Sequence, residues 1–176
     1  MNKLLLSCII LLSSFTLVGC MDKAEKEQKA EASLKKEAVK IATEYSMGQL
    51  SDGKITSGER GTVIVSNDEK RYIIDPVKIF PGIIDDKPGK DIIVTLMSFK
   101  GLDIDNVEQL IMVSASGKLM LLSSVESDMR VLAIEKGVIT AQVPTHPRNT
   151  PLYNCAACQE IINFRFVNGR LEKVEK

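Results

Sequence analysis

The chain has 176 residues, with 23 basic and 23 acidic side chains, four cysteines and one histidine. A balanced charge of this kind provides no field that would attract nucleic acid or anionic lipid, which argues against both as binding partners. The length suits one compact domain that buries enough apolar surface to fold without a scaffold of disulfides.

The first twenty residues have the pattern of a secretory signal. A short basic start over residues 1–3 is followed by a mostly apolar stretch over residues 4–18, and Gly19 stands directly before Cys20. The alternative is a helix that stays in the membrane, but this stretch is shorter than the roughly 20 residues needed to cross hydrocarbon. We therefore expect residues 1–19 to be a lipoprotein signal peptide that is removed.

The segment Leu17-Val18-Gly19-Cys20 resembles the bacterial lipobox. This resemblance implies a diacylglycerol on the sulfur of Cys20 and an acyl chain such as palmitate on its new amino group. One chain binds a membrane only marginally, whereas two or three chains make a lasting anchor. Covalent lipid on Cys20 is the only cofactor that we expect. Because Lys3 leaves with the signal, the mature chain carries a single net negative charge.

The second residue of the mature chain, Met21, bears on its destination. The resemblance to lipoproteins of Gram-negative bacteria implies that an aspartate at this position would retain the protein at the inner membrane. Met21 therefore predicts the outer membrane, facing the periplasm, if the host is Gram-negative. In any host, the resemblance implies a lipid-anchored protein of the cell envelope in oxidising surroundings.

A change in composition divides the segment that follows. Residues 20–33 are mainly Asp, Lys, Glu, Gln and Ala without an apolar stripe, which predicts a lipidated, solvated tether. In residues 34–48, apolar side chains recur at helical spacing and Gly48 supplies a stop. We expect an amphipathic helix that docks on the following domain. A coiled coil with a partner is the alternative, but the apolar face is short.

Residues 49–176 have the apolar pattern of strands. The turns between the runs are too short for parallel crossovers, which predicts antiparallel neighbours. Residues 91–99 are nearly continuous in apolar side chains, as expected of a central strand covered on both faces. Asn168-Gly169 is the strongest two-residue hairpin signal. The expected strands are 62–66, 71–74, 77–80, 91–99, 107–114, 118–125, 129–134, 138–143, 160–167 and 170–174.

These elements predict an α+β fold with one β-rich domain over residues 49–176. We expect the N-terminal helix to pack on a single antiparallel, meander-like sheet of about seven to nine strands. Such a sheet would be able to close partly into a barrel.

The motifs of residues 82–174 include a histidine loop and a close cysteine pair before the final hairpin. Together they resemble a group of uncharacterised bacterial envelope lipoproteins, which implies a lipobox signal and a β-rich domain but no activity. The chain departs from this group at Pro147, where glycine is expected, and near Asp85, where a fuller Asp-x-Asp-Gly run is missing. The motifs are Gly89–Val94, Ser116–Lys118, Ile134–Ile139, Thr145–Pro151 and Phe164–Phe166.

Cys155 and Cys158 are the residues for which the most kinds of chemistry have to be considered. Haem attachment needs a histidine where Gln159 stands, and a thioredoxin-like dithiol needs a helix where a strand is expected. A zinc site needs a fourth ligand besides the two cysteines and His146. We expect an intrachain disulfide that stiffens a long loop. An extracytoplasmic thiol/disulfide or metal-handling role for the two cysteines and His146 is the alternative.

The same loop, residues 144–158, supplies three candidate binding residues, His146, Arg148 and Tyr153. His146 is the only side chain able to act as an imidazole base, yet no nucleophile elbow accompanies it, so we predict no catalytic residue. The carboxylates at 85, 86 and 91 and at 103 and 105 fit no recognised calcium loop, so we predict no metal site.

Function follows only by elimination. We expect a non-catalytic binding or envelope-maintenance module, anchored to the membrane by lipid, with an envelope protein or a cell-wall component as its partner. The second alternative, beside thiol or metal handling, is an inhibitor or exclusion lipoprotein of a mobile element. The sequence predicts no particular oligomeric state.

Overall fold

The structure, a computed structural model, describes the backbone of residues 4–85, 89–148, 150–153, 155 and 157–174. Within these ranges it describes side chains from residue 23 onward. The proposed signal peptide and the side chain of Cys20 therefore lie outside the described side chains. The chain divides into two compact units, residues 1–34 and 35–176. Every buried side chain that the structure describes belongs to the second unit, which therefore contains the core.

Helix α1 spans Leu4–Gly48 and contributes to both units. Residues 23–33 are exposed apart from half-buried Glu31, as their polar composition requires, and Lys29 pairs with Glu25 at 2.6 Å. Among the described residues, no helix is both long and apolar enough to cross a membrane. From residue 35 the burial pattern changes, because Ala38, Ala42 and Ser46 are fully buried at helical spacing.

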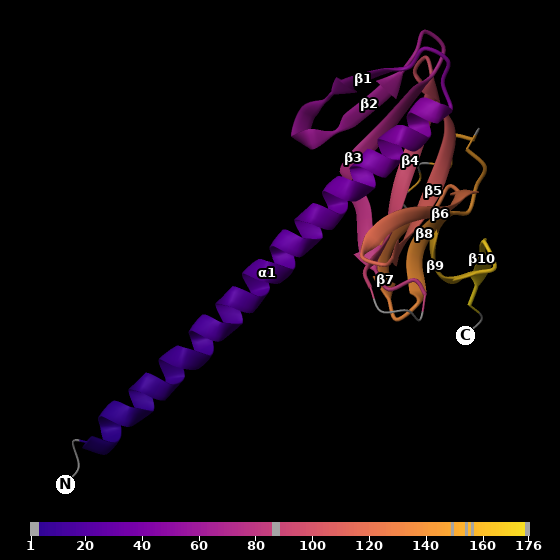
Figure 1. The fold of residues 1–176 in the computed structure, drawn as a ribbon. Coiled ribbons are helices and arrows are strands. Elements are labelled where there is room, and N and C mark those ends of the chain that lie inside the picture. The colour runs from indigo at the N-terminus through magenta and orange to yellow at the C-terminus, as the bar shows by residue number, and fades with distance from the viewer. Residues whose placement is uncertain (1–3, 86–88, 149, 154, 156, 175–176) are drawn as a thin grey trace. The chain divides into compact units, whose positions relative to one another are not determined.

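The last turns of α1 lie on a six-stranded antiparallel sheet, as Figure 1 shows. The Tyr45 hydroxyl donates to the Glu108 carboxylate at 2.6 Å, and the Leu119 amide donates to Glu37 at 3.2 Å. These contacts tie the helix to the last two strands of the sheet in the order given next. The strands follow chain order in a meander: β1 Lys54–Ser57, β2 Val63–Ser66, β3 Arg71–Gly82, β4 Asp91–Lys100, β5 Asp103–Ala115 and β6 Lys118–Glu126.

A second antiparallel sheet of four strands covers the other face of the first. Its order is β10-β9-β8-β7, and a core cluster joins the two sheets, with Ile93 and Ile111 from the first and Val131 and Ile139 from the second. The sheets approach so closely that a Cβ on Gly82 would lie 2.9 Å from the carbonyl oxygen of Ile134. The strands are β7 Arg130–Glu135, β8 Val138–Pro144, β9 Gln159–Val167 and β10 Arg170–Lys173.

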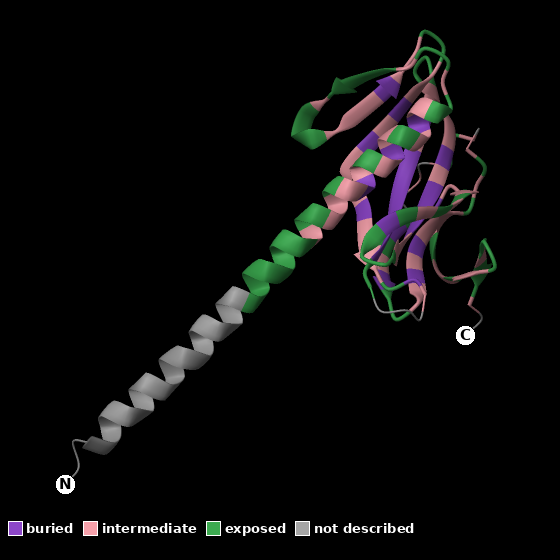
Figure 2. Cartoon of the chain, viewed as in Figure 1, coloured by how far each residue is buried: buried purple, intermediate pink, exposed green. Residues whose placement is uncertain are grey.

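The α+β class is confirmed, but the single sheet of seven to nine strands is wrong. In the described part of the chain, ten strands form two sheets of six and four, and neither sheet closes into a barrel. The short link between β6 and β7 was expected to join neighbours in one sheet, yet it carries the chain across the core to the second sheet. The first six residues of β4, 91–96, are all buried (Figure 2), because α1 lies on one side of the first sheet and the second sheet covers the other.

Two local predictions also differ from the structure. The expected strands 71–74 and 77–80 are one strand, β3, whose pairing with β4 shifts between Ile74 and Ile79. The pairing shift contains Asp75 and Pro76, and proline has no amide hydrogen to donate to a ladder. Strand β1 was not expected, since its four residues are all exposed and carry no apolar alternation.

Two buried polar side chains fix the frame around the site. The amide of Gln109, fully buried, accepts from Thr95 at 2.8 Å and donates to the carbonyls of Ser127 and Met129 at 3.2 and 3.0 Å. These bonds hold the link between the two sheets, and Asp128 lies in that link. Gln109 thereby joins the β4–β5 strand pair to the link around Met129, which lies 20 residues later in the chain.

Candidate functional site

The loop between β8 and β9 is closed at its base. The amide and hydroxyl of Thr145 both donate to the Cys158 carbonyl, at 3.0 and 2.9 Å. Within the loop, the amide and hydroxyl of Thr150 both donate to the Pro147 carbonyl, at 3.1 and 2.8 Å. Hydrogen bonds of this local kind give a turn a defined shape without a helix or strand.

The expected disulfide joins Cys155 to Cys158, with their Cα atoms 5.1 Å apart. The prediction of an intrachain bond is confirmed. Strand β9 starts directly after Cys158, so neither sulfur lies at the start of a helix whose dipole would favour a thiolate. The bond closes a small ring in the same loop that carries Tyr153.

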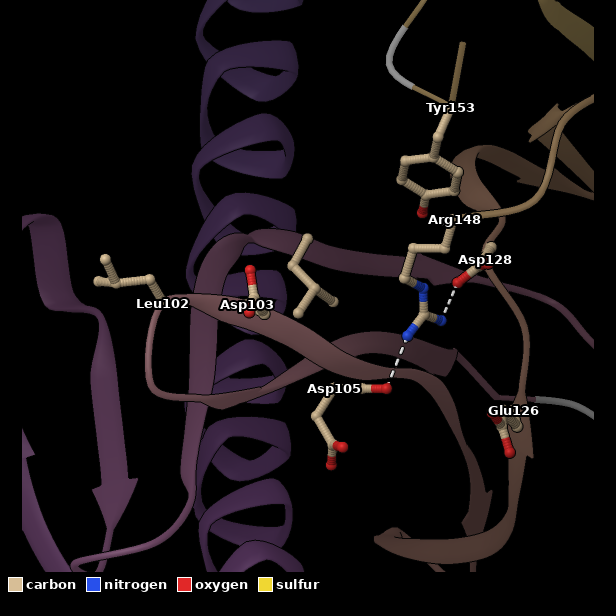
Figure 3. Close-up of a pocket in the computed structure, with 8 residues that line it drawn as sticks. Leu102, Asp103, Asp105, Glu126, Asp128, Arg148 and Tyr153 are labelled. Atoms are coloured by element: carbon tan, nitrogen blue, oxygen red, sulfur yellow. Dashed lines mark hydrogen bonds and ion pairs between the residues drawn. The ribbon is translucent and has the colours of Figure 1, made fainter. Parts of the chain in front are cut away.

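Arg148 connects the loop to the six-stranded sheet. Its guanidinium donates to the Asp128 carboxylate and, at 2.8 Å, to the Asp105 carbonyl (Figure 3). The side chain is 23% exposed, and its Nε is buried without a hydrogen-bond partner. The hydrogen bond that Arg148 donates to Asp128 raises the pKa of Arg148, which keeps the guanidinium charged. A loop residue, an inter-sheet link and a strand thus meet at one cation.

Asp105 belongs to a second group of charges. Its carboxylate pairs with Lys70 at 2.9 Å and with Lys100 at 3.3 Å. The hydrogen bond from Lys70 is the main reason that the pKa of Asp105 is lowered. The Lys70 ammonium also lies 4.9 Å from the centre of the Tyr72 ring. These contacts fix the start of β5, whose backbone carbonyl accepts from Arg148.

Around Arg148 lies an open depression of about 700 Å³, which we call the acidic hollow. Four carboxylates and one guanidinium line it, so its lining carries a net charge of −3. Leu102, at the tip of the β4–β5 hairpin, is 93% exposed at its edge. The lining residues are Leu102, Asp103, Ile104, Asp105, Glu126, Asp128, Arg148 and Tyr153.

Tyr153 closes one side of the acidic hollow. Its hydroxyl points towards Arg148 and Asp128 (Figure 3). Burial, followed by the negative charge of Asp128, raises the pKa of Tyr153, so the phenol stays protonated. A protonated phenol both donates and accepts hydrogen bonds beside a fixed cation.

A second depression, the intersheet cleft, opens beside the first and has a volume of about 720 Å³. Both sheets line it, and it shares Ile104, Asp128 and Tyr153 with the acidic hollow. Its walls are mainly apolar, and its charged lining residues are Lys78, Asp128 and Arg130.

The structure brings two of the three predicted binding residues together. Arg148 and Tyr153 both line the acidic hollow, whereas half-buried His146 lines neither it nor the intersheet cleft. Sequence reasoning missed Asp128, the partner of Arg148, because it lies in a Glu-Ser-Asp run that reads as a turn. It also missed Leu102, although an apolar residue after Gly101 at a hairpin tip was a usable signal.

Metal binding finds no support in the described part of the chain. Those residues contain no group of three or more His, Cys, Asp or Glu side chains that could hold an ion. The carboxylate of Asp91, once a candidate for calcium, instead accepts from the amides of Ile84 and Ser114 at 2.8 and 3.0 Å. Its role is to hold a turn and a strand.

Comparisons of the chain with family models, with curated proteins and with solved structures found no match.

Proposed function

We propose that this protein is a lipid-anchored, non-catalytic binding module of the bacterial cell envelope, and that the acidic hollow is its binding surface. The single observation that carries this proposal is the anchoring of Arg148 and Asp128 beneath an exposed apolar rim. A pre-formed, rigid surface loses little conformational entropy when a partner binds.

The chemistry of the hollow favours a cationic partner. Asp103 and Glu126 are exposed and have no ion pair within the described structure, while Asp128 is held by Arg148. A basic group entering the hollow would meet these two free carboxylates. Leu102 and Ile104 would then bury apolar surface against its neighbours. A partner segment with a basic residue flanked by large apolar residues fits both features.

Site-directed photo-cross-linking in the native host tests this proposal. A photoreactive residue replaces Leu102, and the matched control replaces Ile161, which is 62% exposed on β9 of the other sheet. We expect a discrete adduct at position 102 and none at 161. Combining the probe with Asp103→Asn and Glu126→Gln should abolish the adduct, since attraction to the cation is lost. An adduct of equal yield at position 161 would contradict the proposal. So would an adduct at position 102 whose yield is unchanged when both carboxylates are replaced.

The anchor is tested separately by mass spectrometry of the protein from its native host. We expect the chain to begin at Cys20 with added acyl mass, as the lipobox resemblance implies. An intact Met1 without acyl mass would refute lipidation, but it would not contradict the proposal that the acidic hollow binds a partner.

A further inference from the structure

The intersheet cleft has a graded apolar lining. At its base, Val107, Met129 and Val131 are almost fully buried, with at most 6% of their surface exposed. At its mouth, Val77 is 75% exposed and Leu132 42% exposed. An apolar chain lying from mouth to base would remove the exposed side chains from water, which is favourable in proportion to the area buried. The volume lies within the range of about 300–1,000 Å³ common for small-ligand sites.

Lys78 is one of the three charged residues in this mainly apolar lining. Within the described structure its ammonium has no carboxylate partner, and its hydrogen bond goes to the Sδ of Met97 at 3.1 Å. A thioether is a weak acceptor, so it replaces little of the water that the ammonium has lost. Burial lowers the pKa of Lys78; Asp75 partly opposes this shift, and Arg130 adds to it.

Three other polar residues of the cleft are engaged within the described structure. Thr95 donates to Gln109 at 2.8 Å, Gln159 donates to the Tyr153 carbonyl at 3.4 Å, and Asp128 holds Arg148. Lys78 is therefore a half-buried cation without an anionic partner in the described structure, and exposed Arg130 adds a second positive charge nearby. An anion that reaches Lys78 would restore the interaction that burial removed.

We propose that the intersheet cleft binds an anionic amphiphile with a single apolar chain, its charged head on Lys78 and its chain along the cleft between the sheets. This goes beyond the binding of a cationic partner at the acidic hollow and does not depend on it. The chemistry suits both a free fatty acid and a monoacyl phospholipid.

Calorimetric titration of a chain of residues 23–176 tests the inference. The probes are octanoate, decanoate and dodecanoate, each below its micelle concentration. Since each buried methylene contributes about 0.8 kcal/mol, affinity should rise about fourfold per added methylene. The neutral probe 1-decanol should bind at least about tenfold more weakly than decanoate, because it offers no charge to Lys78. An absence of binding by all three alkanoates would overturn the proposal.

Two variants and their matched controls locate the site. Lys78→Met should weaken decanoate binding at least about tenfold and leave 1-decanol unchanged, whereas Lys118→Met, at an exposed lysine on β6, should change neither. Val77→Asp places a negative charge at the mouth and should also weaken decanoate, whereas Ile161→Asp should not. Cooperative unfolding of each variant shows that it is folded. Equal decanoate binding by Lys78→Met and the parent chain would overturn the proposal.

A final pair of titrations separates the two sources of ligand. Dodecanoate is compared with monododecanoyl phosphatidylglycerol, which carries the same chain on a larger anionic head. Tighter binding of either one supports the inference and identifies the head group that the mouth admits. Binding of an acidic apolar peptide, with neither amphiphile bound, would mean that the cleft is a peptide site and that the proposal is wrong.

Discussion

Polar side chains in the interior between the sheets have hydrogen-bond partners, whereas some polar side chains at the intersheet cleft and the acidic hollow lack them. In the interior, Asp91 accepts three backbone amides and Gln109 uses both ends of its amide. At the cleft, Lys78 meets only a thioether, and at the hollow beside it one nitrogen of Arg148 has no partner. Asp91 and Gln109 are at most 2% exposed, so an unpaired group there would be costly.

The difference separates stability from binding. A buried polar group with all its partners stabilises the fold, and its removal leaves those partners unsatisfied. A half-buried charge without a partner contributes little or nothing to folding, and it remains available to a ligand. Each of the following predictions tests whether a residue stabilises the fold or is available to a ligand.

Asp91→Ala should have the largest effect. It leaves the buried amide of Ile84 and the partly buried amide of Ser114 without an acceptor, and each such loss costs about 1–3 kcal/mol. We expect the free energy of unfolding of residues 23–176 in urea to fall by about 3–5 kcal/mol. Asp103→Ala, at an exposed carboxylate without an ion pair in the described structure, is the control and should change it by less than about 0.5 kcal/mol. Equal losses in the two variants would break the comparison.

Replacing both cysteines of the disulfide by serine should have an intermediate effect. The bond between Cys155 and Cys158 closes a very short ring, for which loop entropy gives about 2 kcal/mol of stabilisation. We expect the unfolding free energy to fall by about this amount. A reductant should lower the stability of the parent chain equally and leave the serine variant unchanged. A reductant effect on the serine variant would show that the loss has another cause.

The ion pairs of Asp105 should contribute a smaller, pH-dependent amount. Its pKa is lowered below the ordinary 3.8, mainly by the hydrogen bond from Lys70. The folded state therefore binds its proton less readily than the unfolded state, so the stabilisation is present above pH 3.8 and is lost as pH falls through the lower, folded pKa. Since the pair is near the surface, we expect at most about 1 kcal/mol. Urea unfolding at pH 5 and below should show a shallower acid loss in Asp105→Asn than in the parent chain.

The sequence allowed the class of fold to be predicted, because short-range patterns carry it. Helical spacing before Gly48, the continuous apolar run after Asp91 and the Asn168-Gly169 turn each depend on neighbours in the chain. The division into two sheets does not depend on such local patterns. The link after Glu126 is short enough for a hairpin, and only the packing of Ile93 and Ile111 against the second sheet shows that it crosses the core.

The same reasoning explains how much of the site was predicted. The loop with Arg148 and Tyr153 stood out because it lies between prolines and beside the cysteines. Asp128 precedes Arg148 by twenty residues, and nothing local to either residue indicates that they pair. Lys78 alternates with apolar residues along β3 and reads as a solvent-facing strand residue. That it lies in a cleft depends on the position of the second sheet, which the sequence did not reveal.

Lys78→Met should have the smallest effect on stability, and it provides the sharpest test of the comparison. The substitution removes a desolvated charge that has no carboxylate partner in the described structure, and it adds an apolar group beside Met97. We expect the free energy of unfolding to stay the same or to rise by up to about 1 kcal/mol. Urea unfolding at neutral pH, without any amphiphile, measures this change.

Lys70→Met is the matched control. Lys70 lies directly before β3, and its side chain is only 25% exposed, but it is paired with Asp105 and its ammonium lies near the Tyr72 ring. Its loss should cost about 1 kcal/mol. The two substitutions make the same chemical change, so their opposite signs would isolate the contribution of the partner. If Lys78→Met were instead the more destabilising of the two, Lys78 would be a structural residue, and its missing partner would say nothing about a ligand.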